Sequence, residues 1–224
     1  NINGLDTKGI HAITMPCYGT TDRTLNNAKK LMELLNVTSY EINIKDACEQ
    51  HYKDIGHDKS NLDVTFENVQ ARERTQILMD ISNKIGGLVV GTGDLSELAL
   101  GWCTYNGDQM SMYGVNASIP KTLVRGILES YAQHHNELRE TLLDICDTPV
   151  SPELLPPNED GTIKQKTEDK IGSYVIHDFI LYYMQRHGFG PRKIFDLYIN
   201  AKTMHEKKMG IENPVIDKAD VLKN

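Results

Sequence analysis

The sequence has few cysteines and aromatic residues, and it lacks long apolar runs and basic runs. Its four cysteines are widely spaced and form no CxxC pair, which indicates reduced thiols in a cytoplasmic protein rather than a disulfide framework or a zinc site. No apolar stretch approaches the ~20 residues that span a bilayer, and no signal peptide is visible. The net charge of −7 without a basic face argues against a nucleic-acid binder.

What is present fits one large domain. The 224 residues, with 39% hydrophobic and 25% charged residues, are enough to bury a sizeable core, so we expect residues 1–224 to form a single α/β domain. The chain has no initiator Met, and its first eight residues are mostly polar. We therefore expect it to be a piece of a longer protein whose fold is incomplete at the N-terminus.

Strand and helix patterns alternate in the first half of the chain. This order implies crossover connections and therefore a parallel sheet with helices packed against it. With three strands visible, the sheet is narrow unless further strands precede Asn1. The expected strands are Ile10–Met15, Thr38–Ile44 and Leu88–Val90, and the expected helices cover about 24–35, 45–52 and 65–85.

The second half has a different character. Apolar residues at helical spacing predict helices over 120–133 and 171–186, and Pro191 is placed to begin a third. Between the first two lies a proline-containing, polar segment. We expect residues 156–170 of this segment to form a mobile flap.

The most informative stretch runs from Gly86 to Lys121. Its apolar start, Leu88–Val90, predicts a buried strand, and Gly91–Asp94 then predict a polar turn at the carboxyl end of that strand. In open α/β sheets ligands bind at this end of the strands. Thr92 and the nearby Glu97 could meet phosphate oxygens and a hard cation there. Glu97 could instead only complement the dipole of the following helix, which is the commoner role.

Residues 101–112 follow that helix and predict a ligand-facing loop. They carry Trp102, Tyr105 and Asp108 but almost no long aliphatic side chains. A lone tryptophan is more often part of a core than of a ligand platform. The neighbours of Trp102 do not continue a helical apolar stripe, however, which favours the site.

Three charged residues give weaker signals. Lys121 could be a solvated lysine, but a helix start disfavours a cation, so an anionic partner is the better interpretation. Arg72 lies four residues after Asn68 and shares one side of the helix with it. A ligand role for Arg72 and a plain solvated surface are equally supported, and the ligand role is weaker for Arg74.

Several segments of the chain, taken in order, resemble one family closely. These segments are ITMPCYGTTDRTLNNA, ENVQARERTQ, GTGDLSELALGWCTYNGDQMSMYGVNASIPKTL, IKQKTEDKIGSY and HDFILYYMQRHGFGPRKI. They resemble the synthetase domain of glutamine-dependent NAD synthetases, and the resemblance covers nearly everything from about Ile10 to Ile199. That family implies a three-layer, parallel-sheet fold of the adenine-nucleotide ATP-pyrophosphatase type, usually dimerised through helices.

The resemblance also implies a reaction and a set of site residues. In the family, ATP adenylates the nicotinate carboxylate of deamido-NAD, pyrophosphate leaves, and ammonia then displaces AMP to give NAD. ATP and Mg²⁺ are therefore the expected cofactors, and an amidase domain supplies the ammonia from glutamine. The matching positions are Thr92, Lys121 and Thr167 for ATP, Glu97 for magnesium, and Asn68, Glu97, Trp102, Tyr105 and Asp108 for deamido-NAD.

Three features of the family have no counterpart in this sequence. These are the SGGxDS phosphate loop, the amidase domain, and a basic FKR-type segment near the C-terminus. Two other functions therefore stay open. The chain could be a nucleotide-binding or oligomerisation module that catalyses nothing alone, or a sister ATP pyrophosphatase that acts on another carboxylate or carbonyl.

Overall fold

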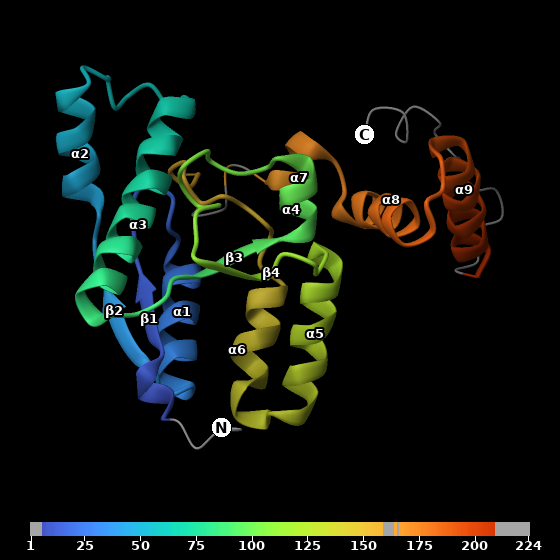
Figure 1. Cartoon of the computed structure of the whole chain (residues 1–224), viewed down its shortest axis with the longest axis horizontal. Coiled ribbons are helices and arrows are strands. Elements are labelled where there is room, and N and C mark those ends of the chain that lie inside the picture. The colour runs from blue at the N-terminus through green and yellow to red at the C-terminus, as the bar shows by residue number, and fades with distance from the viewer. Residues whose placement is uncertain (1–5, 159–163, 165, 209–224) are drawn as a thin grey trace. The chain divides into compact units, whose positions relative to one another are not determined.

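The computed structural model describes residues 6–158, 164 and 166–208, with side chains up to His205, and divides the chain into two compact units. The first unit ends at Thr167 and the second begins at Glu168. Figure 1 shows the elements in chain order. The strands are β1 (His11–Thr14), β2 (Thr38–Glu41), β3 (Val90–Asp94) and β4 (Tyr113–Asn116); the helices are the 3₁₀-helix η1 (Thr7–Gly9), α1 (Asp22–Leu34), α2 (Lys45–Asp54), α3 (Val64–Ile85), α4 (Leu95–Leu100), α5 (Lys121–His134), α6 (Asn136–Cys146), α7 (Thr167–Ile171), α8 (Tyr174–His187) and α9 (Pro191–Lys208).

The first two strands pair as the sequence predicts. β1 and β2 are parallel, with His11 opposite Thr38 and Thr14 opposite Glu41. The connection between them is α1, which packs against both strands (Figure 1). The N-terminus of α1 is fixed because the Thr21 hydroxyl accepts a hydrogen bond from a backbone N–H of the first turn. The predicted α/β character and the parallel pairing are both confirmed.

The third strand corrects the sequence prediction. β3 does not pair with β1 or β2 in the described part of the chain; it pairs in parallel with β4. The segment Gly91–Asp94 is strand and not the predicted turn. Gly91 is tolerated inside the strand because the Ser111 side chain lies where a Cβ atom would project. Gly91 thus leaves room for the Ser111 side chain, whereas a Cβ atom at Gly93 would meet only Glu97 Oε2 at 3.8 Å.

The burial of this segment also differs from the prediction. Val89 is buried, whereas Leu88 and Val90 are 61% and 55% exposed. A strand in a two-stranded sheet has fewer of its side chains covered than the central strand of a wide sheet. On α3, Ile85 is exposed, and the buried face of that helix includes Phe66 and Val69.

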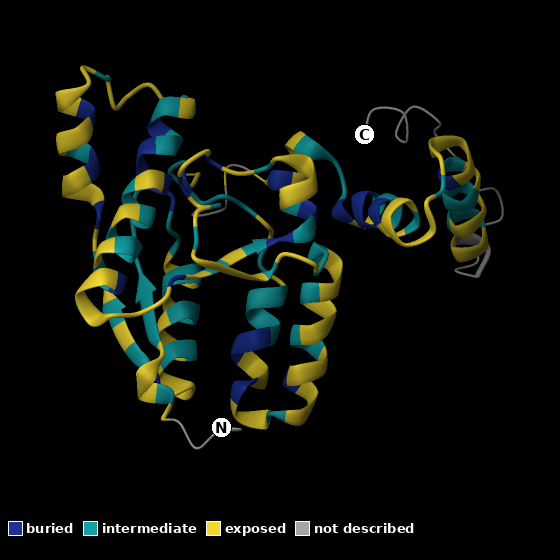
Figure 2. Cartoon of the chain, in the orientation of Figure 1, coloured by how far each residue is buried: buried dark blue, intermediate teal, exposed yellow. Residues whose placement is uncertain are grey.

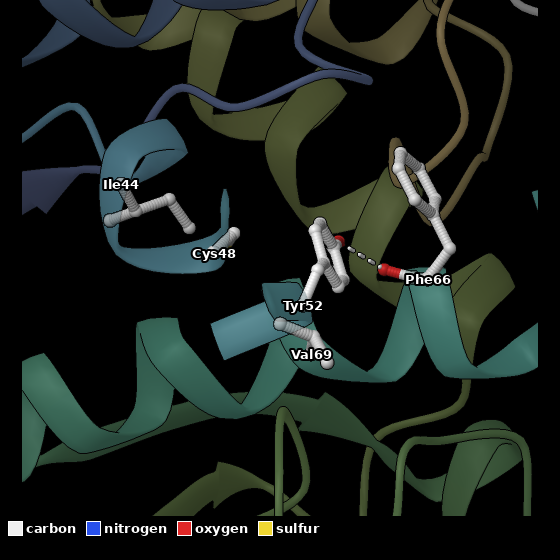
Figure 3. Close-up of a cluster of buried hydrophobic side chains, with 5 residues drawn as sticks. All are labelled: Ile44, Cys48, Tyr52, Phe66 and Val69. Atoms are coloured by element: carbon white, nitrogen blue, oxygen red, sulfur yellow. Dashed lines mark hydrogen bonds between the residues drawn. The ribbon is translucent and has the colours of Figure 1, made fainter. Parts of the chain in front are cut away.

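The main core of the first unit lies between α2 and α3. Figure 3 shows its buried side chains, with Tyr52 stacked on Phe66 at a ring separation of 5.4 Å. The Tyr52 hydroxyl donates a hydrogen bond to the Phe66 carbonyl oxygen at 2.8 Å, so burial of the phenol leaves no unpaired donor. Cys48 of α2 and Ile44, the residue before α2, belong to the same cluster. The core therefore holds α3, the helix that carries Asn68 and Arg72, against α2.

A second, smaller core joins α5 and α6 to α1. Ala132, Leu138 and Leu142 are buried there, and Leu31 of α1 packs against them. Figure 2 shows this buried stripe along α6, while the opposite surface of α5 is largely exposed. The helix predicted at 120–133 is confirmed as α5, but α6 was not predicted.

The described part of the second unit consists of α7 from Glu168 onward, α8 and α9. The helix predicted at 171–186 begins three residues later, at Tyr174, because Gly172 adopts a φ of 85° and separates α8 from the short α7. Phe179 of α8 contacts the Tyr198 ring of α9 edge to face at 5.5 Å. Pro191 begins α9 as predicted. Among the described helices of both units, none has the length and apolar character needed to cross a membrane.

Candidate active site

The junction between β3 and α4 is built around Asp94. This residue ends β3 and caps α4, and it is 2% exposed. Its Oδ1 accepts from the Glu97 backbone N–H at 3.0 Å, while Glu97 Oε2 accepts from the Asp94 backbone N–H at 3.2 Å. This reciprocal capping box fixes the Glu97 carboxylate at the N-terminus of α4.

Lys121 completes this cluster from the start of α5. Its ammonium Nζ lies 2.7 Å from Asp94 Oδ2 and 2.7 Å from Glu97 Oε1. Its backbone N–H donates to the buried Ser96 hydroxyl at 2.9 Å, which ties the starts of α4 and α5 together. Burial alone would lower the pKa of Lys121, but the hydrogen bonds to the two carboxylates outweigh it and raise the pKa above its ordinary value. The lysine is therefore a firmly charged cation between two carboxylates.

The loop after α4 is tethered to this cluster and to α3. Gly101, with a φ of 64°, ends α4, and the Trp102 backbone N–H donates to the Glu97 carbonyl oxygen at 3.0 Å. Further along, the Thr104 backbone N–H donates to Asp108 Oδ1 at 2.6 Å, and the Thr104 hydroxyl lies 2.9 Å from Asn68 Oδ1. The predicted ligand loop is thus a constrained turn and not a loose connection.

α3 contributes two arginines near this loop and near β1. Arg72 donates from Nε to the Tyr105 carbonyl oxygen at 3.2 Å, which is a second link between α3 and the loop. Arg74 is more deeply buried and donates to the Met15 carbonyl oxygen at 3.3 Å. Burial lowers the pKa of Arg74 from its ordinary value. Both arginines therefore bind backbone carbonyl oxygens, a role that the sequence patterns did not indicate.

The structure brings some predicted site residues together. Glu97 and Lys121 form an ion pair, and Asn68 and Asp108 each hydrogen-bond Thr104, a residue that the sequence patterns did not indicate. The Tyr105 side chain is 79% exposed on the same loop. The structure therefore gathers these candidates into two groups, one around Lys121 and one around Thr104.

The remaining candidates lie outside these two groups. Thr92 is exposed on β3, and the Trp102 side chain is half-buried at the start of the loop. Thr167 is 2% exposed, and its backbone N–H donates to the Val150 carbonyl oxygen at 3.0 Å. Residues 159–163 and 165 of the predicted flap lie outside the described residues.

The sequence contained a signal for Asp94 that the turn prediction obscured. Asp94-Leu-Ser-Glu97 has the spacing of a capping box, in which the first residue caps a helix and the fourth returns a side chain to it. The predicted turn treated Asp94 as a polar connector. The structure shows instead that its carboxylate is buried and faces Lys121.

The carboxylates of Asp94 and Glu97 have the chemistry of a divalent-cation site. Mg²⁺ is held in proteins by one or two carboxylates together with water and substrate phosphates. One oxygen of each carboxylate already lies 2.7 Å from the same ammonium, so the two point toward a common position. Among the described residues no group of three or more His, Cys, Asp and Glu side chains could hold a metal ion. Of the two side chains only Glu97 is partly exposed, at 25%, so its carboxylate is the one that fits magnesium held jointly with a phosphate ligand rather than in a closed protein cage.

The fold and this cluster together define an α/β protein with parallel strands and a charged site where a strand passes into a helix. The sequence matches the family model described as NAD synthase over residues 2–209. The chain therefore belongs to the NAD synthase family.

Individual relatives agree with this assignment. The chain is 46% identical over 194 residues to the glutamine-dependent NAD(+) synthetase of Mycobacterium leprae, a match that covers 83% of this chain and 28% of the relative. It is 34% identical over 180 residues to the enzyme of the same name from Acinetobacter baylyi, covering 77% of this chain and 31% of that protein. The chain thus spans less than a third of the length of either relative.

Solved structures share the fold. The structure of NMN synthetase from Francisella tularensis matches with a TM-score of 0.64 at 20% identity, covering 93% of this chain and 78% of that one. The glutamine-dependent NAD+ synthetase of Acinetobacter baumannii, solved in complex with ADP, matches with a TM-score of 0.56 at 23% identity, covering 96% of this chain and 39% of that one. At these identities the likeness concerns the fold alone.

Proposed function

We propose that this chain is the synthetase domain of an enzyme that converts deamido-NAD to NAD at the expense of ATP. The observation that carries the proposal is the Glu97–Lys121 pair at the carboxyl end of β3, in a chain that belongs to the NAD synthase family. A nucleotide site requires a cation for the phosphates and an oxygen ligand for the metal, and this pair supplies both. The ADP complex of the Acinetobacter baumannii relative supports adenine-nucleotide binding.

The proposed reaction has two steps. The nicotinate carboxylate attacks the α-phosphorus of ATP, and the bond to pyrophosphate breaks. Ammonia then attacks the acyl carbon of the adenylate, loses a proton, and expels AMP to leave the amide. Adenylation is needed because a carboxylate oxygen leaves badly, whereas AMP is a good leaving group. Magnesium, when bound with ATP, neutralises phosphate charge.

The chain's own residues have distinct tasks in this scheme. Lys121 binds an ATP phosphate oxygen, and the Glu97 carboxylate holds the metal. Thr92 and Thr167 contact ATP. The loop after α4 receives the nicotinate half of deamido-NAD, with the contacts supplied by Asn68, Glu97, Trp102, Tyr105 and Asp108.

Several wider features belong to the same proposal. The fold is of the three-layer, ATP-pyrophosphatase type, and the SGGxDS phosphate loop and the amidase domain are supplied by the rest of the protein. Ammonia then comes from glutamine. In support, the matched region makes up only 28% and 31% of the length of two relatives named as glutamine-dependent.

Self-association is also part of the proposal. On α5, Leu123, Ile127 and Tyr131 are 52%, 48% and 46% exposed and line a groove of about 490 Å³. A row of large apolar side chains on one helix face is suited to a second copy of the same face. Ile127→Asp should convert an oligomer to monomers in sedimentation experiments, and an unchanged mass would exclude this face.

The test of the catalytic proposal is Glu97→Gln in the complete enzyme. The variant keeps an oxygen acceptor for the capping box but loses the charge that holds the metal, so pyrophosphate release with ATP and deamido-NAD should be abolished while the circular dichroism spectrum is unchanged. Glu137→Gln is the matched control, because Glu137 also lies in the first turn of a helix, α6. Unchanged pyrophosphate release in Glu97→Gln would refute the assignment.

The isolated 224-residue chain provides a further comparison. It contains no SGGxDS segment, and loss of one oxyanion donor in other enzymes already costs ~10²–10³-fold in rate. We expect this chain alone to form no NAD above background from ATP, deamido-NAD, magnesium and ammonia. NAD formation by the chain alone would show that the phosphate loop is dispensable. Nucleotide binding without turnover by the complete protein would favour a binding module instead.

A further inference from the structure

The two oxygens of the Asp94 carboxylate have the same kinds of partner as the two oxygens of the Glu97 carboxylate. Each uses one oxygen to accept a backbone N–H of the other residue, and each turns its second oxygen to the Lys121 ammonium at 2.7 Å. The capping box and the ion pairs are therefore separate sets of contacts. A change of partner at the second oxygen of Glu97 leaves the helix cap intact.

The two carboxylates differ in how freely they can exchange that partner. The Asp94 side chain is 2% exposed, whereas the Glu97 side chain is 25% exposed. A buried carboxylate that loses its cation bears a large desolvation penalty, and a partly exposed one can be solvated. Asp94 is also held by the backbone of β3, since it pairs with Asn116 of β4. Asp94 is thus the fixed partner of the ammonium, and Glu97 is the exchangeable one.

We infer that Asp94 is the positioning residue of Lys121 and keeps its ammonium at the start of α4 and α5. When the nucleotide binds, the ammonium exchanges its second partner, the Glu97 carboxylate, for a phosphate oxygen. The inference rests on the proposed function, because it takes ATP as the ligand of Lys121. In this arrangement the released oxygen of Glu97 becomes available to the metal as the lysine turns to the phosphate. Asp94 itself contacts neither substrate nor metal.

Substitutions at Asp94 separate its charge from its role as a helix cap. Serine and asparagine cap helices about as well as aspartate, whereas alanine does not. Asp94→Ser and Asp94→Asn should therefore keep the cap of α4 and remove only the charge that faces Lys121. Asp94→Ala removes both. Asp63→Ser is the matched control, because Asp63 caps α3 through the Thr65 and Phe66 backbone N–H groups and lies on another helix.

A double-mutant cycle tests whether Asp94 acts through Lys121. In the complete enzyme, the affinity for a non-hydrolysable ATP analogue with Mg²⁺ is measured by calorimetry for Asp94→Ser, Lys121→Gln and the double variant. We expect each single variant to weaken binding by about tenfold or more, the loss typical of one charge-assisted hydrogen bond. The double variant should bind no more weakly than Lys121→Gln alone, because the effect of Asp94 passes through the lysine. Independent, multiplying losses would overturn the inference.

Thermal unfolding of the 224-residue chain gives the second readout, without nucleotide. Asp94→Ser should unfold at a higher temperature than Asp94→Ala, since it retains the cap. If Asp94→Ser binds the nucleotide as well as the wild type does, Asp94 is only a cap and the inference is wrong. Failure of the proposed function is distinguishable, because then the wild-type enzyme itself would not bind the analogue, whatever residue stands at position 94.

Discussion

The Thr104 hydroxyl donates a hydrogen bond to Asn68 Oδ1 at 2.9 Å and so joins the loop after α4 to the helix α3, 36 residues earlier in the chain. Thr104 is 9% exposed, so this bond is shielded from water. A second link runs from Arg72 Nε to the Tyr105 carbonyl oxygen. These contacts hold the proposed deamido-NAD loop on a helix that is itself fixed by the main core.

The first prediction concerns Asn68. Asn68→Ala removes the acceptor of the Thr104 hydroxyl and should lower the free energy of unfolding by about 1 kcal/mol, the usual net worth of one hydrogen bond. Thr104→Val is the matched variant, since it loses the same bond but leaves the Asn68 amide in place. If Asn68 also contacts deamido-NAD, calorimetric titration should show much weaker binding in Asn68→Ala than in Thr104→Val. Equal losses would assign Asn68 a purely structural role.

The second prediction concerns Trp102. If its indole stacks on the nicotinate half of the substrate, Trp102→Ala should weaken deamido-NAD binding by ~1–3 kcal/mol, as for bases stacked on aromatic side chains, and leave ATP binding nearly unchanged. Tyr105→Ala should weaken deamido-NAD in the same direction. Tyr182→Ala, at an exposed tyrosine of α8, is the control. Should Trp102→Ala weaken both substrates equally, the tryptophan supports the structure and not the ligand.

The helices of this chain could be predicted because their signals are local. The spacing of apolar residues and the capping residues gave α1, α2, α3 and α5 to within three residues at each end. Strand pairing depends on contacts that no local pattern contains. The pairing of β3 with β4 instead of β1 or β2 was therefore missed, and so was the passage of β3 through Gly91 and Gly93.

In the site, too, residues with a local signal were predicted and residues defined by long-range contacts were missed. Glu97 and Lys121 were both candidates from the sequence, and in the structure they form an ion pair. Asp94 was missed because a polar residue between glycine and leucine was interpreted as part of a turn. Thr104 was missed because its partners, Asn68 and Asp108, come from two different segments. The ligand contacts of all the candidate residues stay predictions.

The third prediction concerns the thiol of Cys17. A hydrogen bond from the Cys48 thiol, with smaller contributions from the Tyr18 backbone and Arg74, holds the pKa of Cys17 below its ordinary value despite partial burial. Burial instead raises the pKa of Cys103. When iodoacetamide labelling is followed by peptide mapping over a pH series, the midpoint for Cys17 should lie below that for Cys103. Cys48→Ala should move the Cys17 midpoint upward. A Cys17 midpoint at or above that of Cys103 would contradict the assignment.

The last prediction concerns acid stability and the contact between α1 and α6. Arg23 donates to both carboxylate oxygens of Asp144, and Asn27 donates to one of them. These bonds, that from Arg23 first, lower the pKa of Asp144 from 3.8 to about 2. The unfolded chain therefore binds a proton at position 144 more readily than the folded chain does. The stabilisation is complete well above pH 3.8 and is lost as the pH falls from there through about 2. Both side chains are more than a third exposed, so the effect should be modest and should weaken in high salt.

In urea unfolding, the midpoint of Asp144→Asn should lie below that of the wild type at pH 7, and the difference should shrink as the pH is lowered from 4 to 2. In an Arg23→Met background the same comparison should give a smaller and flatter difference, because the main cause of the pKa shift is gone. A difference between Asp144→Asn and the wild type that stays constant down to pH 2 would show that the Arg23–Asp144 pair does not act through its charge.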